Sequence, residues 1–125
     1  MKFIKTIIIA LFVTGTFVAC SKDHDAPPFS MEGSWTGKIG TGSATPSGQY
    51  ALNIKKGGSL DRIGSTGSVS ASGTWNVQSN AFTAIYFYSN GTVVDLTGTV
   101  DKSTNKITGT WSNNGNEQGT FYVNK

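Results

Sequence analysis

The stretch Ser68-Val69-Ser70-Ala71-Ser72-Gly73-Thr74-Trp75-Asn76-Val77-Gln78 decides the fold class. Its odd positions hold Val, Ala, Gly, Trp and Val, and its even positions hold Ser, Thr, Asn and Gln. Successive side chains of a β-strand point to opposite faces of the sheet. The alternation therefore predicts a strand with one buried and one solvated face, and we expect the odd face to point inward.

Similar short runs continue on both sides of this strand, separated roughly every ten residues by Gly, Asn and Ser clusters. Asn90-Gly91 and Asn114-Gly115 are strong hairpin signals, because both residue types tolerate a positive φ. The pattern predicts strands near residues 33–39, 48–55, 59–63, 68–77, 81–88, 92–100, 106–112 and 117–124. We therefore expect an all-β fold: a single eight-stranded antiparallel up-and-down meander that closes into a small barrel over residues 32–125.

Carrying the inward face through each turn predicts one continuous inner surface. Besides the odd positions of the strand over residues 68–78, it contains Trp35, Gly37, Ile39, Tyr50, Leu52, Ile54, Leu60, Arg62, Ile85, Phe87, Val94, Leu96, Gly98, Val100, Ile107, Gly109, Trp111, Gly119, Phe121 and Val123. The fifth strand is apolar on both faces, so its orientation depends on the turn before it. An odd-length turn at residues 78–80 keeps Ile85 and Phe87 inside, whereas an even one exchanges the two faces.

The orientation of the fifth strand leaves two interpretations of Phe82, Tyr86 and Tyr88. With the odd turn they form an exposed aromatic cluster, which is a common mark of an interface. With a two-residue turn at Ser79-Asn80 they line the interior, and Tyr86 lies opposite Gly73. We favour the outward arrangement slightly, because it keeps the other apolar strand residues on one surface.

A short Gly-x-aromatic repeat runs through the predicted inner face. It occurs as Gly33-Ser34-Trp35, Gly73-Thr74-Trp75, Gly109-Thr110-Trp111 and Gly119-Thr120-Phe121. Glycine in a strand marks a bend or a close approach of another backbone. These glycines either allow a small barrel to coil tightly enough to close, or leave space for a ligand, and we favour closure.

The Gly33-Ser34-Trp35 triplet on the first strand is similar to the Gly-x-Trp motif of the lipocalins, and the eight-stranded meander fits the same class. The resemblance covers residues 31–125 and implies a lipocalin-like barrel. The Thr-Asp-Tyr signature of typical lipocalins is missing, and a domain of about 95 residues is nearer to an avidin in size. The resemblance therefore implies a fold and no particular ligand.

The N-terminus has the pattern of a targeting segment. Lys2 and Lys5 precede an apolar run over residues 7–13, which is too short to span a bilayer. Phe17-Val18-Ala19-Cys20 resembles the lipobox of bacterial lipoprotein signal peptides. This resemblance implies that residues 1–19 are a signal peptide and that Cys20 carries palmitate-type acyl chains as a membrane anchor. The alternative is an ordinary secretory signal that happens to contain the only Cys of the chain.

The charge balance excludes one class of partner. The formal charge of +3 falls to about +1 without Lys2 and Lys5, since ten basic residues become eight against seven acidic ones. Nucleic-acid binding needs a clustered basic face, which the sequence does not provide. We therefore expect no nucleic-acid partner.

Residues 20–31 read as a polar, flexible tether in which Pro27-Pro28 favours extended chain. Ser21 after the cysteine is similar to an outer-membrane sorting signal. Lys22-Asp23-His24-Asp25 is similar to the surface-export signal of some Gram-negative lipoproteins, although a solvated spacer explains it equally well. We expect a protein anchored to the outer membrane of a Gram-negative bacterium, either in the periplasm or at the surface.

Catalytic residues are scarce. His24 is the only histidine and lies in the tether, so no Ser-His-Asp or Cys-His arrangement assembles in the barrel. Acylation of Cys20 excludes a Cys/His metal site, and the predicted outward position of Asp95 argues against a carboxylate pair. We expect neither an enzyme nor a cofactor or metal.

These observations favour a lipid-anchored, non-enzymatic protein that holds a small apolar or amphipathic ligand in the barrel. The candidate ligand-binding residues are Trp35, Tyr50, Arg62, Trp75, Trp111 and Phe121. Arg62, the one charged residue on the predicted inner face, either holds an anionic head group or lies solvated at the rim. The alternative is an interaction or inhibitor module that binds a protein, or a second copy, through Phe82, Tyr86 and Tyr88. A cavity of about 300 Å³ or more would favour ligand binding.

Overall fold

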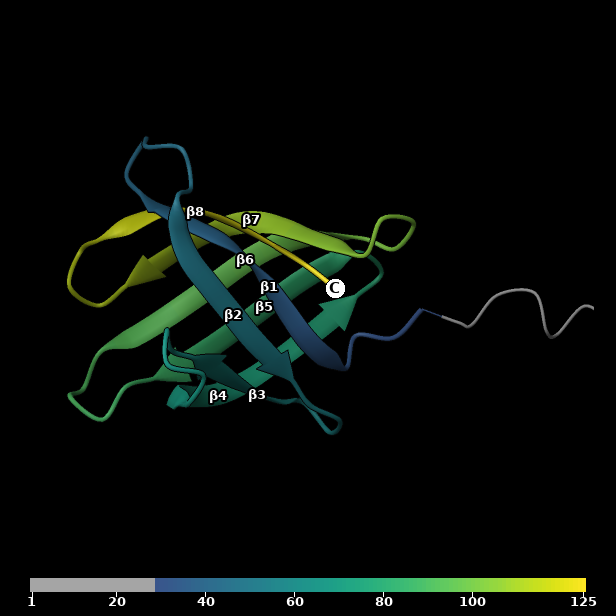
Figure 1. Ribbon diagram of the computed structural model, residues 1–125, viewed down its shortest axis with the longest axis horizontal. Helices are drawn as coiled ribbons and strands as arrows, with labels where there is room; N and C mark the ends of the chain where they lie inside the picture. Colours follow the sequence, from purple (N-terminus) through teal and green to yellow (C-terminus); the bar gives the residue numbers. More distant parts are fainter. Residues whose placement is uncertain (1–28) are drawn as a thin grey trace, which may run out of the picture.

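The computed structural model describes residues 29–125. The predicted signal segment, Cys20 and most of the predicted tether lie outside these residues. The described chain forms eight strands: β1 (Gly33–Thr41), β2 (Gly48–Ile54), β3 (Ser59–Ile63), β4 (Val69–Gln78), β5 (Ala81–Phe87), β6 (Val93–Asp101), β7 (Lys106–Asn113) and β8 (Gln118–Asn124). Each strand pairs antiparallel with the next, and β1 pairs with β8 to close the barrel (Figure 1).

The all-β class, the meander order and the closed barrel agree with the prediction. Each predicted strand lies within two residues of the observed one at both ends. Within residues 29–125, no helix is long and apolar enough to cross a membrane.

The barrel has two different ends. One end carries the loops 42–47, 64–68, 88–92 and 114–117, and we call it the loop end. The opposite end carries the short turns 55–58, 79–80 and 102–105 and the segment that leads into β1. In Figure 1 the described chain enters β1 at this second end, on the side away from the four loops.

The N-terminal end is closed by side chains around Trp35, which is fully buried. Its indole nitrogen donates to the carbonyl of Met31 at 2.8 Å, and Phe29 meets its ring edge-on with centroids 6.4 Å apart. The ammonium of Lys125 lies 5.8 Å from the same ring and donates to the carbonyl of Ser30 at 2.7 Å. The two ends of the described chain therefore meet over Trp35.

The core fills the middle of the barrel with large side chains. Those less than 2 % exposed are Trp35, Tyr50, Tyr86, Phe82, Phe121, Leu52, Ile54, Leu60, Leu96, Ile107, Val100 and Val123. Most of these residues belong to the predicted inner face. Val69 was also predicted to face inward, but its side chain is 55 % exposed. It lies at the first position of β4, next to a register shift between Arg62 and Ile63.

The predicted orientation of β5 was wrong. Gln78 pairs directly with Ala81, so the turn contains only Ser79 and Asn80, and Ser79 adopts a φ of 56°. This even turn exchanges the two faces of the strand. Phe82 and Tyr86 are therefore buried, Tyr88 is half-buried, and Phe87, which we expected inside, is 51 % exposed. The proposed exposed cluster of Phe82, Tyr86 and Tyr88 does not exist.

The inward glycines let neighbouring strands approach closely. A Cβ on Gly73 would lie 1.8 Å from the carbonyl oxygen of Ile85, and one on Gly119 would lie 1.9 Å from that of Gly40. Gly37 and Gly109 would meet backbone oxygens at 2.0 and 2.1 Å. The space beside these glycines is occupied by backbone, which supports closure rather than room for a ligand.

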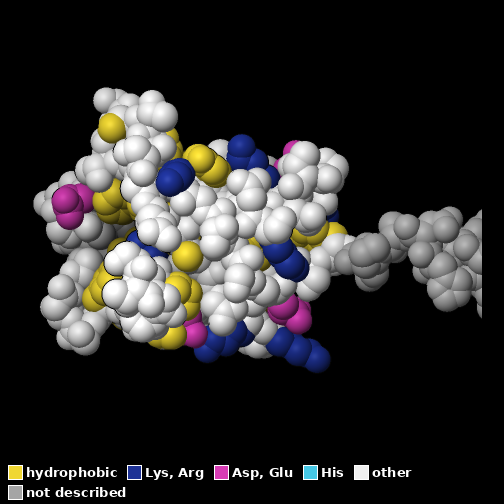
Figure 2. All heavy atoms as spheres, viewed as in Figure 1, with side chains coloured by type: hydrophobic (Ala, Val, Ile, Leu, Met, Phe, Trp, Pro, Cys, Tyr) yellow, Lys and Arg dark blue, Asp and Glu magenta, His cyan; other side chains and the backbone are white. Residues whose placement is uncertain are grey.

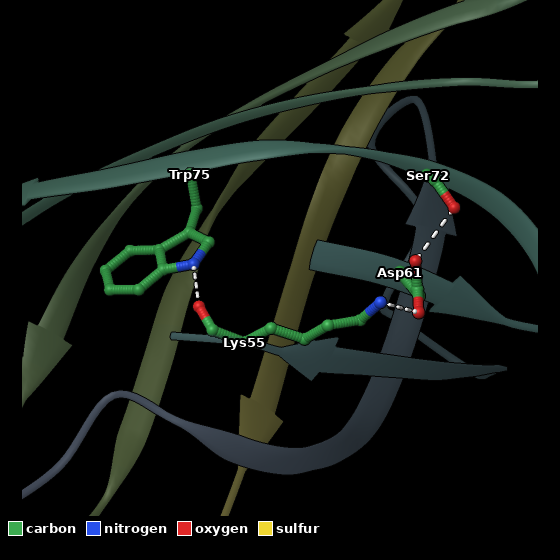
Figure 3. A network of polar contacts seen from close by, with 4 residues as sticks. All are labelled: Lys55, Asp61, Ser72 and Trp75. Atoms are coloured by element: carbon green, nitrogen blue, oxygen red, sulfur yellow. Dashed lines mark hydrogen bonds and ion pairs between the residues drawn. The ribbon is translucent and has the colours of Figure 1, made fainter. Parts of the chain in front are cut away.

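A polar network on the outside of the barrel ties β2, β3 and β4 together (Figure 3). Asp61 is 7 % exposed, forms an ion pair of 2.8 Å with Lys55 and accepts a hydrogen bond of 2.8 Å from Ser72. The hydrogen bond from Lys55, followed by that from Ser72, lowers the pKa of Asp61. The indole nitrogen of Trp75 donates to the carbonyl of Lys55 at 2.9 Å, and this ring is only half-buried.

Replacing Gly73 with Ala tests the closure argument. The new methyl group collides with the backbone of β5, so we expect the free energy of unfolding to fall by about 1–3 kcal/mol or more. Gly115→Ala is the matched control, since its Cβ would meet its nearest neighbour, Asn113 Oδ1, at 3.4 Å. Urea denaturation measures both variants, and equal midpoints would contradict the role of Gly73.

Candidate functional site

The loop end holds a polar group of side chains that point toward the barrel axis. We call it the mouth cluster, and it consists of Tyr50 on β2, Arg62 on β3, and Tyr86 and Tyr88 at the end of β5. The guanidinium carbon of Arg62 lies 4.6 Å from the centroid of the Tyr50 ring. This distance is within the range of a cation–π contact.

Strand register explains how the two buried tyrosines reach this position. Tyr50 lies directly opposite Gly37, and Tyr86 lies directly opposite Gly73. A large aromatic side chain beside a cross-strand glycine compensates for the missing side chain. The same glycines that allow the barrel to close therefore also accommodate the aromatic part of the mouth cluster.

The two tyrosines are joined through their hydroxyl groups. Tyr50 Oη and Tyr86 Oη share a hydrogen bond of 2.9 Å in a buried setting. Burial, reinforced by the neighbouring Tyr86, raises the pKa of Tyr50 well above its usual value. Burial also raises the pKa of Tyr86 to about 12, although the hydrogen bond from Tyr50 opposes the shift. Both phenols therefore stay neutral under ordinary conditions and act as hydrogen-bonding groups.

Aromatic edges hold the pair in place. The ring of Phe121 meets Tyr50 edge-on with centroids 5.7 Å apart, and Tyr88 meets Tyr86 in the same way at 5.8 Å. Edge-to-face contacts of this kind stabilise a fixed arrangement of the rings. The hydroxyl groups are thus oriented by packing.

Arg62 has no acidic partner among residues 29–125. In this part of the chain, the ion pair within 4 Å is formed by Lys55 and Asp61. The guanidinium is half-buried and donates to the carbonyl of the neighbouring Ile63. Arg62 also donates to the hydroxyl of Tyr86, which lowers the pKa of that phenol. These partners still leave some of its five donors free for an acceptor outside the protein. A positive charge placed in this way favours an anion as its missing partner.

Apolar side chains also lie at the loop end. Ile39 and Tyr88 are half-buried against the core, and Val69 is exposed at the start of β4. In Figure 2, hydrophobic side chains show mainly toward the loop end, on the left of the view. The mouth cluster therefore joins one cation to an apolar rim.

The structure brings together three of the six predicted ligand-binding residues. Tyr50 contacts both Arg62 and Phe121. Trp35 lies at the closed end, Trp75 bonds to the β2–β3 turn, and Trp111 donates to the carbonyl of Gly40 at 2.8 Å. These indoles do not line a shared cavity, because core side chains fill the space between them.

Tyr86 is the residue that our preferred interpretation of the sequence misplaced. The signal that would have found it is its position opposite Gly73, which follows only from a two-residue turn. Asp95 is exposed on the outer face, as predicted. Within the described part of the chain, no three His, Cys, Asp or Glu side chains group together as metal ligands. Cys20 and His24 lie outside that part.

The buried tyrosine pair predicts how the barrel responds to alkali. The pKa of each phenol is raised in the folded state, so its contribution to stability is complete below the unfolded value of about 10 and is lost as the pH rises toward 12. We expect tyrosinate absorbance to rise in two phases, with the late phase coincident with unfolding. Tyr86→Phe should shrink the late phase, whereas the matched change Tyr122→Phe, of a half-buried ring, should not. A late phase of unchanged size in Tyr86→Phe would contradict the assignment.

The fold agrees with what the Gly33-Ser34-Trp35 triplet implied, namely an eight-stranded antiparallel meander closed into a barrel. No protein-family model, curated protein or solved structure matches the chain. The functional argument therefore depends on the contacts and charges of the mouth cluster.

Proposed function

We propose that the protein is a non-enzymatic binding protein that holds a small amphipathic molecule with an anionic head group at the loop end of the barrel. One observation carries this proposal: the half-buried guanidinium of Arg62 lies over the Tyr50 ring without an acidic partner among the described residues. Partial burial weakens the hydration of this charge, so a bound anion stabilises it.

The head group would interact with Arg62. A carboxylate or phosphate accepts two parallel hydrogen bonds from one guanidinium, and such charge-assisted bonds are about twice as strong as neutral ones. The neutral hydroxyls of Tyr50 and Tyr86 lie next to this position and would complete the polar part of the site.

The apolar part of the ligand would lie along the rim rather than deep in the barrel. Ile39, Val69 and Tyr88 provide apolar surface at the loop end, whereas the middle of the barrel is filled by core side chains. The ligand is therefore a short or partly exposed amphiphile. A binding role without catalysis fits the cluster, which contains no carboxylate or imidazole that would act as a general base.

We also propose that Cys20 is acylated and anchors this domain to the outer membrane. The support is the Phe17-Val18-Ala19-Cys20 sequence and the polar stretch that follows it. The described domain begins next to Trp35, at the end opposite the mouth cluster. A membrane attached through residues 20–28 would therefore leave the loop end free to meet a ligand.

The ligand proposal predicts a charge-dependent interaction. We expect the full chain to bind dodecanoate in isothermal titration calorimetry, and to bind dodecanol, which lacks the charge, at least about tenfold more weakly. Arg62→Gln should weaken dodecanoate binding by about tenfold to a hundredfold, because a charge-assisted bond contributes about 1.5–3 kcal/mol.

Lys38→Gln is the matched control for Arg62→Gln. Lys38 is a cation exposed on the outer face of β1, so its removal changes the net charge equally without touching the mouth cluster. Dodecanoate affinity should be unchanged in this variant. Equal affinities of wild type and Arg62→Gln for dodecanoate would overturn the proposal.

The anchor is tested by replacing Cys20 with Ser. Without the thiol no acyl chain is attached, so we expect the variant to lose its membrane association and the lipid mass on its mature N-terminus. Mass spectrometry of the wild-type protein should find diacyl or triacyl modification of Cys20. Detection of a wild-type mature N-terminus free of lipid would refute the assignment.

A further inference from the structure

The outer face of β4 to β8 carries two parallel rows of side chains that cross the strands. The first row consists of Thr74, Ile85, Asp95, Ser112 and Gln118, which are direct neighbours in register. The second row consists of Asn76, Thr83, Thr97, Thr110 and Thr120, paired in the same way. All ten side chains are exposed except Ile85, which is half-buried.

A trough runs between these rows. One hollow of about 400 Å³ lies over β6 to β8, and a second of about 270 Å³ lies over β4 to β6. Asp95 lines both, so the two hollows lie on either side of it. With neighbouring strands about 4.8 Å apart, the five strands give the trough a length of about 19 Å. An extended chain fits this shape better than a compact molecule does.

Polar side chains line the larger hollow, the smaller one adds the apolar Trp75, Ala84 and Ile85, and the one charge on these walls is negative. Hydroxyl groups come from Thr and Ser, amides come from Asn76 and Gln118, and Asp95 supplies one carboxylate near the middle. In the described part of the chain, no Lys or Arg lines either hollow. Such walls repel anionic chains, and they favour a ligand that is rich in neutral hydrogen-bond donors.

The threonines suit this role for a second reason. A β-branched side chain has few accessible rotamers, so the hydroxyls of Thr83, Thr97 and Thr110 are held in place before a ligand arrives. Little conformational entropy is then lost when hydrogen bonds form. Closure of the barrel also disfavours the main competing mode of recognition, because each of the eight described strands already has a neighbour on both sides and offers little edge to an extended peptide.

We propose that this trough binds an uncharged oligosaccharide chain, with Asp95 accepting hydrogen bonds from sugar hydroxyls at its centre. The donors and acceptors of the two rows match the hydroxyls that such a chain presents along its whole length. The site is independent of the proposed function at the mouth cluster, since it lies on the outer face and shares no residue with that cluster.

The experiment measures binding of three uncharged hexasaccharides, maltohexaose, cellohexaose and chitohexaose, to the full chain by isothermal titration calorimetry. We expect at least one of them to bind. Asp95→Ala should raise its Kd at least about tenfold, and Thr97→Val, which removes one hydroxyl at constant shape, should raise it severalfold. Glu32→Ala, the matched loss of an exposed carboxylate outside the trough, should leave the Kd unchanged.

Arg62→Gln separates the two sites, because it should retain hexasaccharide binding while it loses dodecanoate. Failure of all three sugars to bind would overturn the proposal. An unchanged Kd in Asp95→Ala, or equally tight binding of anionic hexagalacturonate, would overturn it as well.

Discussion

Close approach of neighbouring strand backbones at the inward glycines is the constraint on which the rest of this structure depends. At Gly37, Gly73, Gly109 and Gly119, a side chain would overlap a carbonyl oxygen of the adjacent strand. Close contact at these points allows a short meander to coil and close between β1 and β8. Closure gives each of the eight described strands a neighbour on both sides, which protects a small antiparallel sheet from pairing with other chains.

A tightly coiled barrel has a narrow interior, and large side chains fill it. Trp35 occupies the N-terminal end, and Phe82, Tyr86 and Phe121 occupy the rest of the core. The proposed ligand site therefore lies where the packing of the core ends. At the loop end, the glycines opposite Tyr50 and Tyr86 accommodate two rings whose hydroxyls meet beside Arg62.

The two proposed sites differ in the chemistry that they offer. The mouth cluster presents a cation on an apolar background and fits an anionic amphiphile. The outer trough presents hydroxyls, amides and the carboxylate of Asp95, which fit an uncharged polyhydroxylated chain. Alternation along each strand explains the contrast, since the same backbone directs apolar residues inward and Thr, Ser and Asn outward. A domain this small thus carries two surfaces of different chemical character.

The sequence by itself determined the eight strands and the faces of seven of them, because the alternation and the turn residues are local signals. It also determined that Arg62 is the one inward cation and that Asp95 faces outward. Only the tertiary structure decided the orientation of β5. That choice depends on Ser79 adopting a φ of 56°, which non-glycine residues rarely do and which no local pattern announced. The contacts of Tyr86 with Tyr50 follow from it, since they join residues 36 positions apart through the register of a closed barrel.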